Sequence, residues 1–221
     1  MQTGRLIEVK EKQTTQGIVV RDICPAAPGM KDWQPMSFSP RTGLLYIPHQ
    51  NLCEDVEAMS ASYIAGTPYV GASVVYKPGP GGNRGALTAW DPAQAKIAWE
   101  VKENFPVWSG TVVTAGDVVF YGTLEGYLKA VDPKTGKELW KFKMPSGIIG
   151  NVFTYEYSGK QYVGIYSGIG GWAGIGMAAG LTGNTEGLGA VGGYKDLAKY
   201  TTLGGSLFVF ALPDSARTAS R

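Results

Sequence analysis

Hydrophobic and polar residues alternate in short stretches along much of the chain, and the region from Gly85 to Lys141 states one such pattern twice. It reads GALTAWDPAQAKIAWE and then GYLKAVDPKTGKELWK, with matching positions such as Asp91 and Asp132 separated by 41 residues. The alternation predicts strands, and each Asp-Pro predicts a tight turn before the return strand. Periods near forty residues with four short strands are typical of β-propeller blades. We therefore expect an all-β fold of stacked blades, with Trp99 and Trp140 packed between neighbouring blades.

Further strands are expected on both sides of the two repeats. Residues 37–47 predict a strand, a Pro-x-x-Gly turn and a strand, which we assign to another blade. Hairpins are expected at 111–121 and 155–166, whereas residues 55–76 show no helical period. The expected parts of this single partial propeller domain, residues 1–221, are blade fragments over 1–84, repeats over about 85–125 and 126–166, a glycine-rich loop over 167–193, a closing strand over 205–212 and a frayed tail over 213–221.

The beginning of the chain resembles part of a blade. Residues 2–6 read like the turn at 134–138, as expected for a blade that is cut within a hairpin, although a disordered leader is the alternative. The blades that can be counted are too few to close a ring, and open rings expose strand edges. We therefore expect an N-terminal portion to precede this sequence.

Composition excludes two classes of partner. The chain has 44% hydrophobic residues, 17% charged residues and a net charge of +2, and it contains no basic block. Nucleic acid is therefore not expected as a partner. No apolar run reaches the roughly eighteen residues of a membrane-spanning helix, so a chain that crosses the membrane is not expected either.

Common catalytic motifs such as GxSxG, HExxH, a Walker loop and CxxC are absent from the sequence. The single histidine, His49, is interpreted as a loop residue. The acidic cluster Glu54, Asp55 and Glu57 is interpreted as a solvated face rather than a metal site. The two cysteines, Cys24 and Cys53, fit either two buried thiols or one disulfide, which the chain-entropy model would value at about 3.5 kcal/mol.

Two stretches are not explained by the blade pattern. Residues 107–110 place Trp108 outside the register of the closing tryptophans. Residues 167–174 surround Trp172 with four glycines, which would let the backbone approach a flat ligand with its amides free to bind carboxylates or carbonyls. The alternative is a glycine-rich loop that packs against a neighbouring blade.

Several uncommon strings, in order, resemble the C-terminal part of the quinoprotein alcohol dehydrogenases that use pyrroloquinoline quinone (PQQ), and above all the large subunit of the methanol dehydrogenases. The resemblance covers about residues 3–212. The strings are RDICP at 21–25, LCED at 52–55, GTPYVGA at 66–72, FPVWSG at 105–110, GTLEGYLKA at 122–130 and SGIGGW at 167–172.

The resemblance implies an eight-bladed propeller in the periplasm, with PQQ and a calcium or lanthanide ion near its axis. By this analogy Cys24 and Cys53 form a structural disulfide. The implied cofactor-contacting residues are Trp108, Gly171 and Trp172, together with Gln50 or Asn51, where the family has an asparagine and this sequence departs from it. The string YIPHQNLC at 46–53 favours the lanthanide type.

The resemblance also implies an activity, namely oxidation of a small primary alcohol of the methanol or ethanol class. A hydride would pass to PQQ, and electrons would leave to a cytochrome c. In the family the metal-binding side chains, the catalytic aspartate, a vicinal disulfide over the cofactor and a tryptophan beneath it lie upstream of the matching region. We therefore name no catalytic residue and no metal ligand in this chain, and we expect the isolated chain to be inactive. A homodimer is left open.

The rival hypothesis is a propeller without enzymatic activity, a binding scaffold of the outer-membrane assembly type. Such scaffolds share the Asp-Pro-x-Thr-Gly turn and the closing tryptophan of the blade. A binding scaffold does not require a tryptophan outside the repeat register, such as Trp108, or the glycines of residues 167–174.

Overall fold

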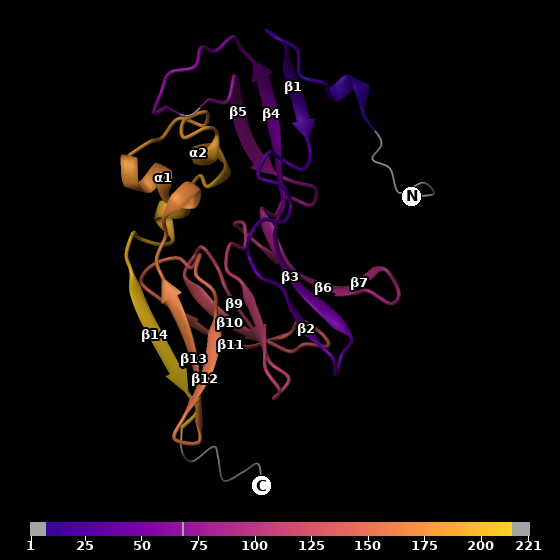
Figure 1. Cartoon of the computed structure of the whole chain (residues 1–221), viewed down its shortest axis with the longest axis vertical. Helices are drawn as coiled ribbons and strands as arrows, with labels where there is room; N and C mark the ends of the chain where they lie inside the picture. The colour runs from indigo at the N-terminus through magenta and orange to yellow at the C-terminus, as the bar shows by residue number, and fades with distance from the viewer. Residues whose placement is uncertain (1–7, 68, 214–221) are drawn as a thin grey trace.

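The structure is a computed structural model that describes residues 8–67 and 69–213. Its strands form four antiparallel sheets, in the orders β1-β4-β5, β2-β3-β6-β7, β11-β10-β9-β8 and β12-β13-β14 (Figure 1). The strands are β1 (Val19–Ile23), β2 (Ser37–Ser39), β3 (Leu44–Gln50), β4 (Leu52–Ala58), β5 (Ala72–Pro78), β6 (Gly85–Asp91), β7 (Lys96–Glu103), β8 (Thr111–Val113), β9 (Val119–Gly122), β10 (Tyr127–Val131), β11 (Glu138–Lys143), β12 (Phe153–Tyr157), β13 (Lys160–Ser167) and β14 (Ser206–Ala211). The helices are η1 (Lys10–Lys12), α1 (Gly171–Ala179), α2 (Ala190–Gly193) and η2 (Leu197–Lys199).

Three of the sheets are blades that follow one another along the chain. Figure 1 shows them in its lower half, from β2-β3-β6-β7 through β8–β11 to β12–β14, with the fourth sheet and the helices above them. Successive strands within β8–β11 pair with their neighbours in sequence, as a short twisted blade requires. The two expected hairpins are observed as β8–β9 and β12–β13, and the expected closing strand is observed as β14. The prediction of an all-β fold is confirmed.

The repeated turn and tryptophan join neighbouring blades. The Asp132 carboxylate accepts hydrogen bonds from the backbone N–H groups of Lys134 and Thr135, at 3.0 and 2.9 Å, and Gly136 completes the turn with a φ of 72°. Trp99, from the preceding blade, donates its indole Nε1–H to the carbonyl oxygen of Pro133 at 3.0 Å. Its ring covers Gly136 so closely that a Cβ there would lie 2.6 Å from it. The predicted location of Trp99 between blades is confirmed.

Residues 37–47 were expected in another blade, and this expectation is wrong. β2 pairs with β3, and β3 pairs with β6 from Leu45 opposite Trp90 to Gln50 opposite Gly85, so these residues complete the blade of the first repeat. Between β3 and β6 the chain leaves the blade, and β4 pairs with β1 on one side and with β5 on the other to form a separate sheet. These two strands have no simple alternation of apolar and polar residues, because β4 carries three acidic residues and buries one of them.

The glycine-rich stretch 167–193 is also not a plain loop, because it contains α1 and α2. α1 ends at Gly180, which adopts the left-handed conformation that closes helices, with a φ of 66°. The helices belong to an insertion between β13 and β14. This insertion connects the second and third strands of its blade, as the insertion between β3 and β6 does in the first blade. In the middle blade the same connection, between β9 and β10, is only residues 123–126. We call residues 168–205 the cap.

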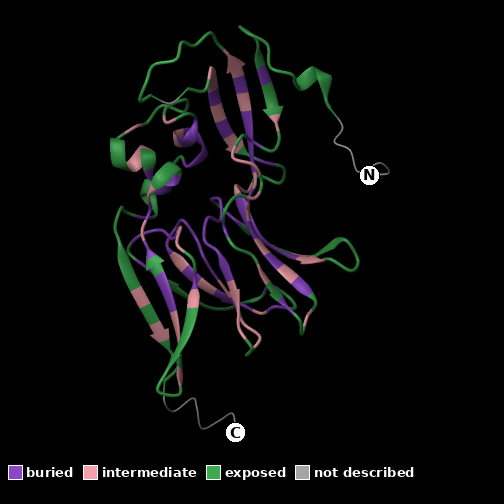
Figure 2. Cartoon of the chain, in the orientation of Figure 1, coloured by how far each residue is buried: buried purple, intermediate pink, exposed green. Residues whose placement is uncertain are grey.

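The buried core lies mainly between the blades and beneath the cap, as Figure 2 shows. One buried cluster, centred on Tyr46, Leu87 and Tyr121, joins the first two blades. A second, centred on Leu128 and Ile165, joins the second and third blades. The expected turn at 2–6 and most of the expected tail lie outside the described residues. Within 8–67 and 69–213, no helix is long and apolar enough to cross a lipid bilayer.

Candidate functional site

Cys24 and Cys53 form a disulfide with an S–S distance of 1.99 Å, as the resemblance implied. The bond joins the end of β1 to β4, so it fixes the edge of the inserted sheet. The neighbouring acidic residues are not a uniformly solvated face. Glu54 is buried and accepts a hydrogen bond from the Ala27 N–H at 3.0 Å, whereas Asp55 pairs with Lys77 at 2.6 Å. That part of the interpretation is wrong for Glu54.

Trp108 is buried in the connection between the first two blades, with 8% of its surface exposed. Its indole Nε1–H donates to the hydroxyl oxygen of Tyr194 in the cap, at 2.7 Å. A second indole, that of Trp33, has its ring centre 6.3 Å from the Trp108 ring. Trp108 therefore has an aromatic neighbour on one side and a polar tether to the cap.

The glycine-rich segment 167–174 lies against the same cluster as Trp108. Ile169 and Ala173 are buried in the cluster that contains Trp108, and Tyr194 and Leu197 also belong to it. The two stretches that the blade pattern does not explain are thus brought together, although they are about sixty residues apart in sequence.

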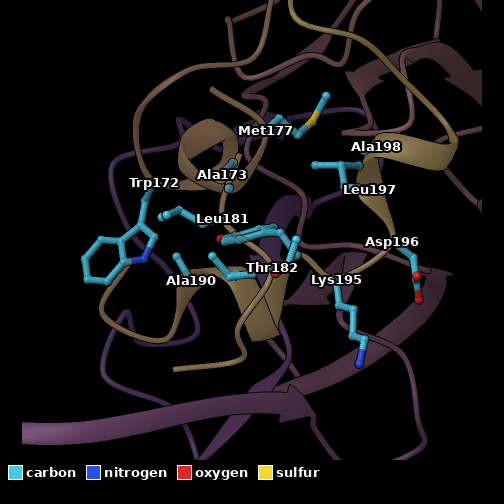
Figure 3. Close-up of a pocket in the computed structure, with 13 residues that line it drawn as sticks. Trp172, Ala173, Met177, Leu181, Thr182, Ala190, Lys195, Asp196, Leu197 and Ala198 are labelled. Carbon is cyan, nitrogen blue, oxygen red and sulfur yellow. The ribbon is translucent and has the colours of Figure 1, made fainter. Parts of the chain in front are cut away.

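Trp172 is placed differently from Trp108. It lies in the first turn of α1 with 40% of its surface exposed, and its ring centre is 6.5 Å from that of Tyr76 on β5. It borders a cavity of about 260 Å³ between α1 and the α2–η2 segment. Figure 3 shows Trp172 at one end of this cavity and the side chains of Lys195 and Asp196 at the other.

Gly171 begins α1 with a φ of 54°, which favours glycine, and a Cβ there would meet no atom within 4 Å. The backbone of Gly170 and Gly171 therefore borders open space. A flat molecule could approach it without a side chain in the way.

The structure separates the two candidate amides. Asn51 donates to the carbonyl oxygens of Pro80 and Asn83, at 3.0 and 2.9 Å, so its side chain holds the loop before β6. Gln50 is fully buried with 0% exposure, and neither its Nε2 nor its Oε1 has a hydrogen-bond partner. Buried amides are almost always satisfied in folded proteins, so an unsatisfied one indicates an additional group beside it.

Gln50 also lies near the segment that carries Trp108. It pairs with Gly85, and a Cβ at Gly85 would lie 2.5 Å from the carbonyl oxygen of Phe105. The adjacent His49 accepts a backbone hydrogen bond from Val107 at 3.4 Å. His49 is a residue of β3, not of a loop as expected, and its Nε2 lies 2.9 Å from the Thr88 hydroxyl.

Sequence reasoning missed Trp33 and Tyr194 as neighbours of Trp108, and Asp32 as a neighbour of Tyr194. Asp32 precedes Trp33 and lies close enough to Tyr194 for its charge to raise the pKa of that hydroxyl, although burial is the main cause of the increase. Tyr194 is therefore protonated at neutral pH. No local pattern marks these residues, since Trp33 and Tyr194 meet Trp108 only through tertiary packing. The described residues contain no group of three or more His, Cys, Asp or Glu side chains that could hold a metal ion.

Known proteins resemble the chain over nearly all of its length. Residues 81–163 match the family model for the β-propeller domain of PQQ-dependent glucose, ethanol and alcohol dehydrogenases. The lanthanide-dependent methanol dehydrogenase of Methylorubrum extorquens is 57% identical over 217 residues, which are 96% of this chain and 36% of that protein. Subunit 1 of the cytochrome c methanol dehydrogenase of the same organism is 44% identical, over 96% of this chain and 35% of its own length.

A solved structure gives the same result in three dimensions. A europium-containing methanol dehydrogenase superposes with a TM-score of 0.88 at 51% sequence identity, over 93% of this chain and 37% of that one. The chain thus spans about a third of the length of the relatives that it matches. The sequence resemblance and the predicted propeller fold are therefore confirmed: the close homologues of this chain are PQQ-dependent alcohol dehydrogenases.

Proposed function

We propose that this chain supplies one wall of the cofactor site in a PQQ-dependent alcohol dehydrogenase. The observation that carries the proposal is the joint burial of Trp108 with Ile169 and Ala173, since a scaffold would not need these two stretches to meet. The unsatisfied amide of Gln50 fits a quinone cofactor, because its N–H groups can donate to carbonyl or carboxylate oxygens and its oxygen can accept from an N–H group. The residues that would hold the cofactor are Trp108, Trp172, Gln50 and the backbone around Gly171.

The proposed reaction is oxidation of a primary alcohol of the methanol or ethanol class to the aldehyde. When bound, the metal-activated quinone would take up the hydride from the alcohol carbon, while a base outside this chain takes the hydroxyl proton. The residues of this chain contribute orientation and shelter from water: the indole rings supply flat apolar surfaces, and Gln50 supplies the polar contact. One relative is subunit 1 of a cytochrome c methanol dehydrogenase, and this similarity favours a cytochrome c as the electron acceptor. A cytochrome c acceptor in turn favours a periplasmic location.

For the metal we propose a lanthanide ion, with calcium as the alternative. The identity to the lanthanide-dependent relative is 57%, compared with 44% for the cytochrome c methanol dehydrogenase subunit. The described residues contain no group of three or more His, Cys, Asp or Glu side chains that could hold the ion, so the proposed ligands lie outside these residues. A homodimer, which the sequence left open, stays a prediction.

The proposal can be tested with a fusion protein. In it, this chain replaces the matching segment of the Methylorubrum extorquens lanthanide-dependent methanol dehydrogenase. After addition of PQQ and a lanthanide, we expect quinone absorbance that survives dialysis and alcohol-dependent reduction of a dye. Gln50→Ala should weaken quinone retention about tenfold, because a buried hydrogen bond to a charged or polar group is worth about 1.5 kcal/mol.

Gln94→Ala is the matched control, since Gln94 is exposed in the turn after β6. It should leave quinone retention unchanged. A well-folded fusion protein that retains no quinone and reduces no dye would reject the proposal and favour the scaffold.

A further inference from the structure

Tyr194 reaches from the cap to the connection between the first two blades. Its hydroxyl oxygen accepts the indole N–H of Trp108 at 2.7 Å, and both side chains are 8% exposed. Because water is excluded from this contact, Trp108 has no solvent molecule to replace the hydroxyl. The contact joins two parts of the chain that are 86 residues apart.

The backbone that carries Tyr194 is held firmly in place. The Tyr194 N–H donates to the carbonyl oxygen of Ala190 at 2.9 Å, and α2 lies against β5. A Cβ at Gly193 would lie 3.2 Å from the Tyr76 ring, and one at Gly189 would lie 2.9 Å from the Val74 carbonyl oxygen. These glycines allow close packing of the cap on the inserted sheet, so the origin of the Tyr194 side chain is fixed.

We propose that Tyr194 is a positioning residue for Trp108. The hydroxyl of Tyr194 selects the orientation in which the indole ring of Trp108 faces the quinone. This inference depends on the proposed function. The apolar neighbours of Trp108, which include Phe105, Leu124 and Ile169, fill the volume around the ring but do not bind its N–H. An indole rotated by half a turn would present a similar shape, yet it would bury its N–H without an acceptor, which costs about 1–3 kcal/mol.

The hydroxyl of Tyr194 is thus needed for orientation and not for packing. Phenylalanine at this position would fill the same space and leave the indole N–H of Trp108 unsatisfied. Tyr194→Phe therefore separates the two roles. The matched control is Tyr200→Phe, because the Tyr200 ring contacts Phe105 of the same cluster at 5.6 Å and is half exposed.

The test uses the fusion protein described above, labelled with 5-fluorotryptophan. The ¹⁹F resonance of position 108 is identified by its loss in Trp108→Phe. In Tyr194→Phe we expect this resonance to shift and broaden, the resonances of Trp99 and Trp140 to stay in place, and bound PQQ to be lost on dialysis about tenfold faster. The factor corresponds to about 1.4 kcal/mol for an unsatisfied buried group. Tyr200→Phe should change neither the resonance of position 108 nor the retention of PQQ.

Three results would overturn the inference. The first is an unchanged resonance of position 108 in Tyr194→Phe, and the second is a shifted resonance with unchanged retention of PQQ. The third is a shift of the Trp99 and Trp140 resonances as well, which would indicate a general structural role. If the unsubstituted fusion protein binds no PQQ, the proposed function fails, whereas the ¹⁹F comparison still reports on the tether between Tyr194 and Trp108.

Discussion

Trp99 and Trp140 hold matching positions in the two repeats, yet their surroundings differ. Trp99 donates to the Pro133 carbonyl oxygen and covers Gly136 in the next blade. Trp140 is 41% exposed and packs edge-on against Phe210 of β14, with ring centres 5.4 Å apart. Tryptophan at the same position of the repeat therefore makes different contacts in the two blades, depending on the blade that follows.

This difference predicts unequal effects of one substitution. In the fusion protein Trp99→Phe should lower the free energy of unfolding by about 1–2 kcal/mol, because it removes the hydrogen bond to Pro133 and part of a ring that packs closely on Gly136. Trp140→Phe should cost less, since its ring is only partly covered. Chemical denaturation followed by circular dichroism measures both changes. Equal costs would show that the indole N–H of Trp99 contributes nothing to the docking of the blades.

Glu54 predicts a dependence of stability on pH. Burial raises the pKa of this carboxyl, partly offset by the hydrogen bond from the Ala27 N–H. A folded-state pKa above the unfolded value means that ionised Glu54 destabilises the fold, and that this effect builds up as the pH rises from the ordinary value to the raised one. Glu54→Gln keeps an oxygen for the Ala27 N–H and removes the charge. At pH 7 it should raise the free energy of unfolding, and the difference from the parent should vanish below the ordinary value of 4.5.

Thermal unfolding between pH 3.5 and 8 measures this difference. Glu54→Ala, which also removes the hydrogen-bond acceptor, should be less stable than Glu54→Gln throughout this range. If the unsubstituted protein were more stable than Glu54→Gln at pH 7, favourable interactions of the Glu54 carboxylate would outweigh the cost of burying its charge, which would contradict the prediction.

At the scale of elements, two insertions at matching positions of the first and third blades make contact above the middle blade. α2 packs on β5, and Trp172 of α1 approaches Tyr76 of the same strand. α2 therefore depends on a strand that precedes it by more than a hundred residues. Where α2 packs on β5, Gly189 and Gly193 leave no room for larger side chains.

Gly189→Ala should release the cap from β5. The residue has a φ of 84°, and a Cβ there would lie 2.9 Å from the Val74 carbonyl oxygen, so both strain and a close contact oppose alanine. We expect a loss of about 2 kcal/mol or more and faster proteolysis within 168–205. Gly205→Ala is the control, because a Cβ at Gly205 meets no atom within 4 Å. Equal proteolysis of the two variants would contradict the proposed contact.

At the scale of the molecule, the third blade has three strands among residues 8–67 and 69–213, where the first two blades have four. Its outer strand β14 exposes Leu207 and Val209, and an unpaired strand edge with apolar side chains favours association. We therefore expect the isolated 221-residue chain to aggregate or form oligomers in size-exclusion chromatography. With PQQ and a lanthanide it should reduce no dye in the presence of methanol, whereas the fusion protein should be active. Turnover by the isolated, monomeric chain would refute this prediction.

Patterns within a few residues determined the parts of the fold that the sequence predicted. Strand alternation and turn chemistry act locally, which is why the 41-residue repeat, the turn at Asp132 and the hairpins at β8–β9 and β12–β13 were predictable. The pairing of β3 with β6, the helices of the cap and the hydrogen bond from Trp108 to Tyr194 were not predictable. They depend on faces buried between segments that are distant in sequence, and no local pattern encodes which faces meet. The tertiary structure alone therefore decided that the Gln50 side-chain amide is left unsatisfied while the Asn51 amide nitrogen holds the loop before β6.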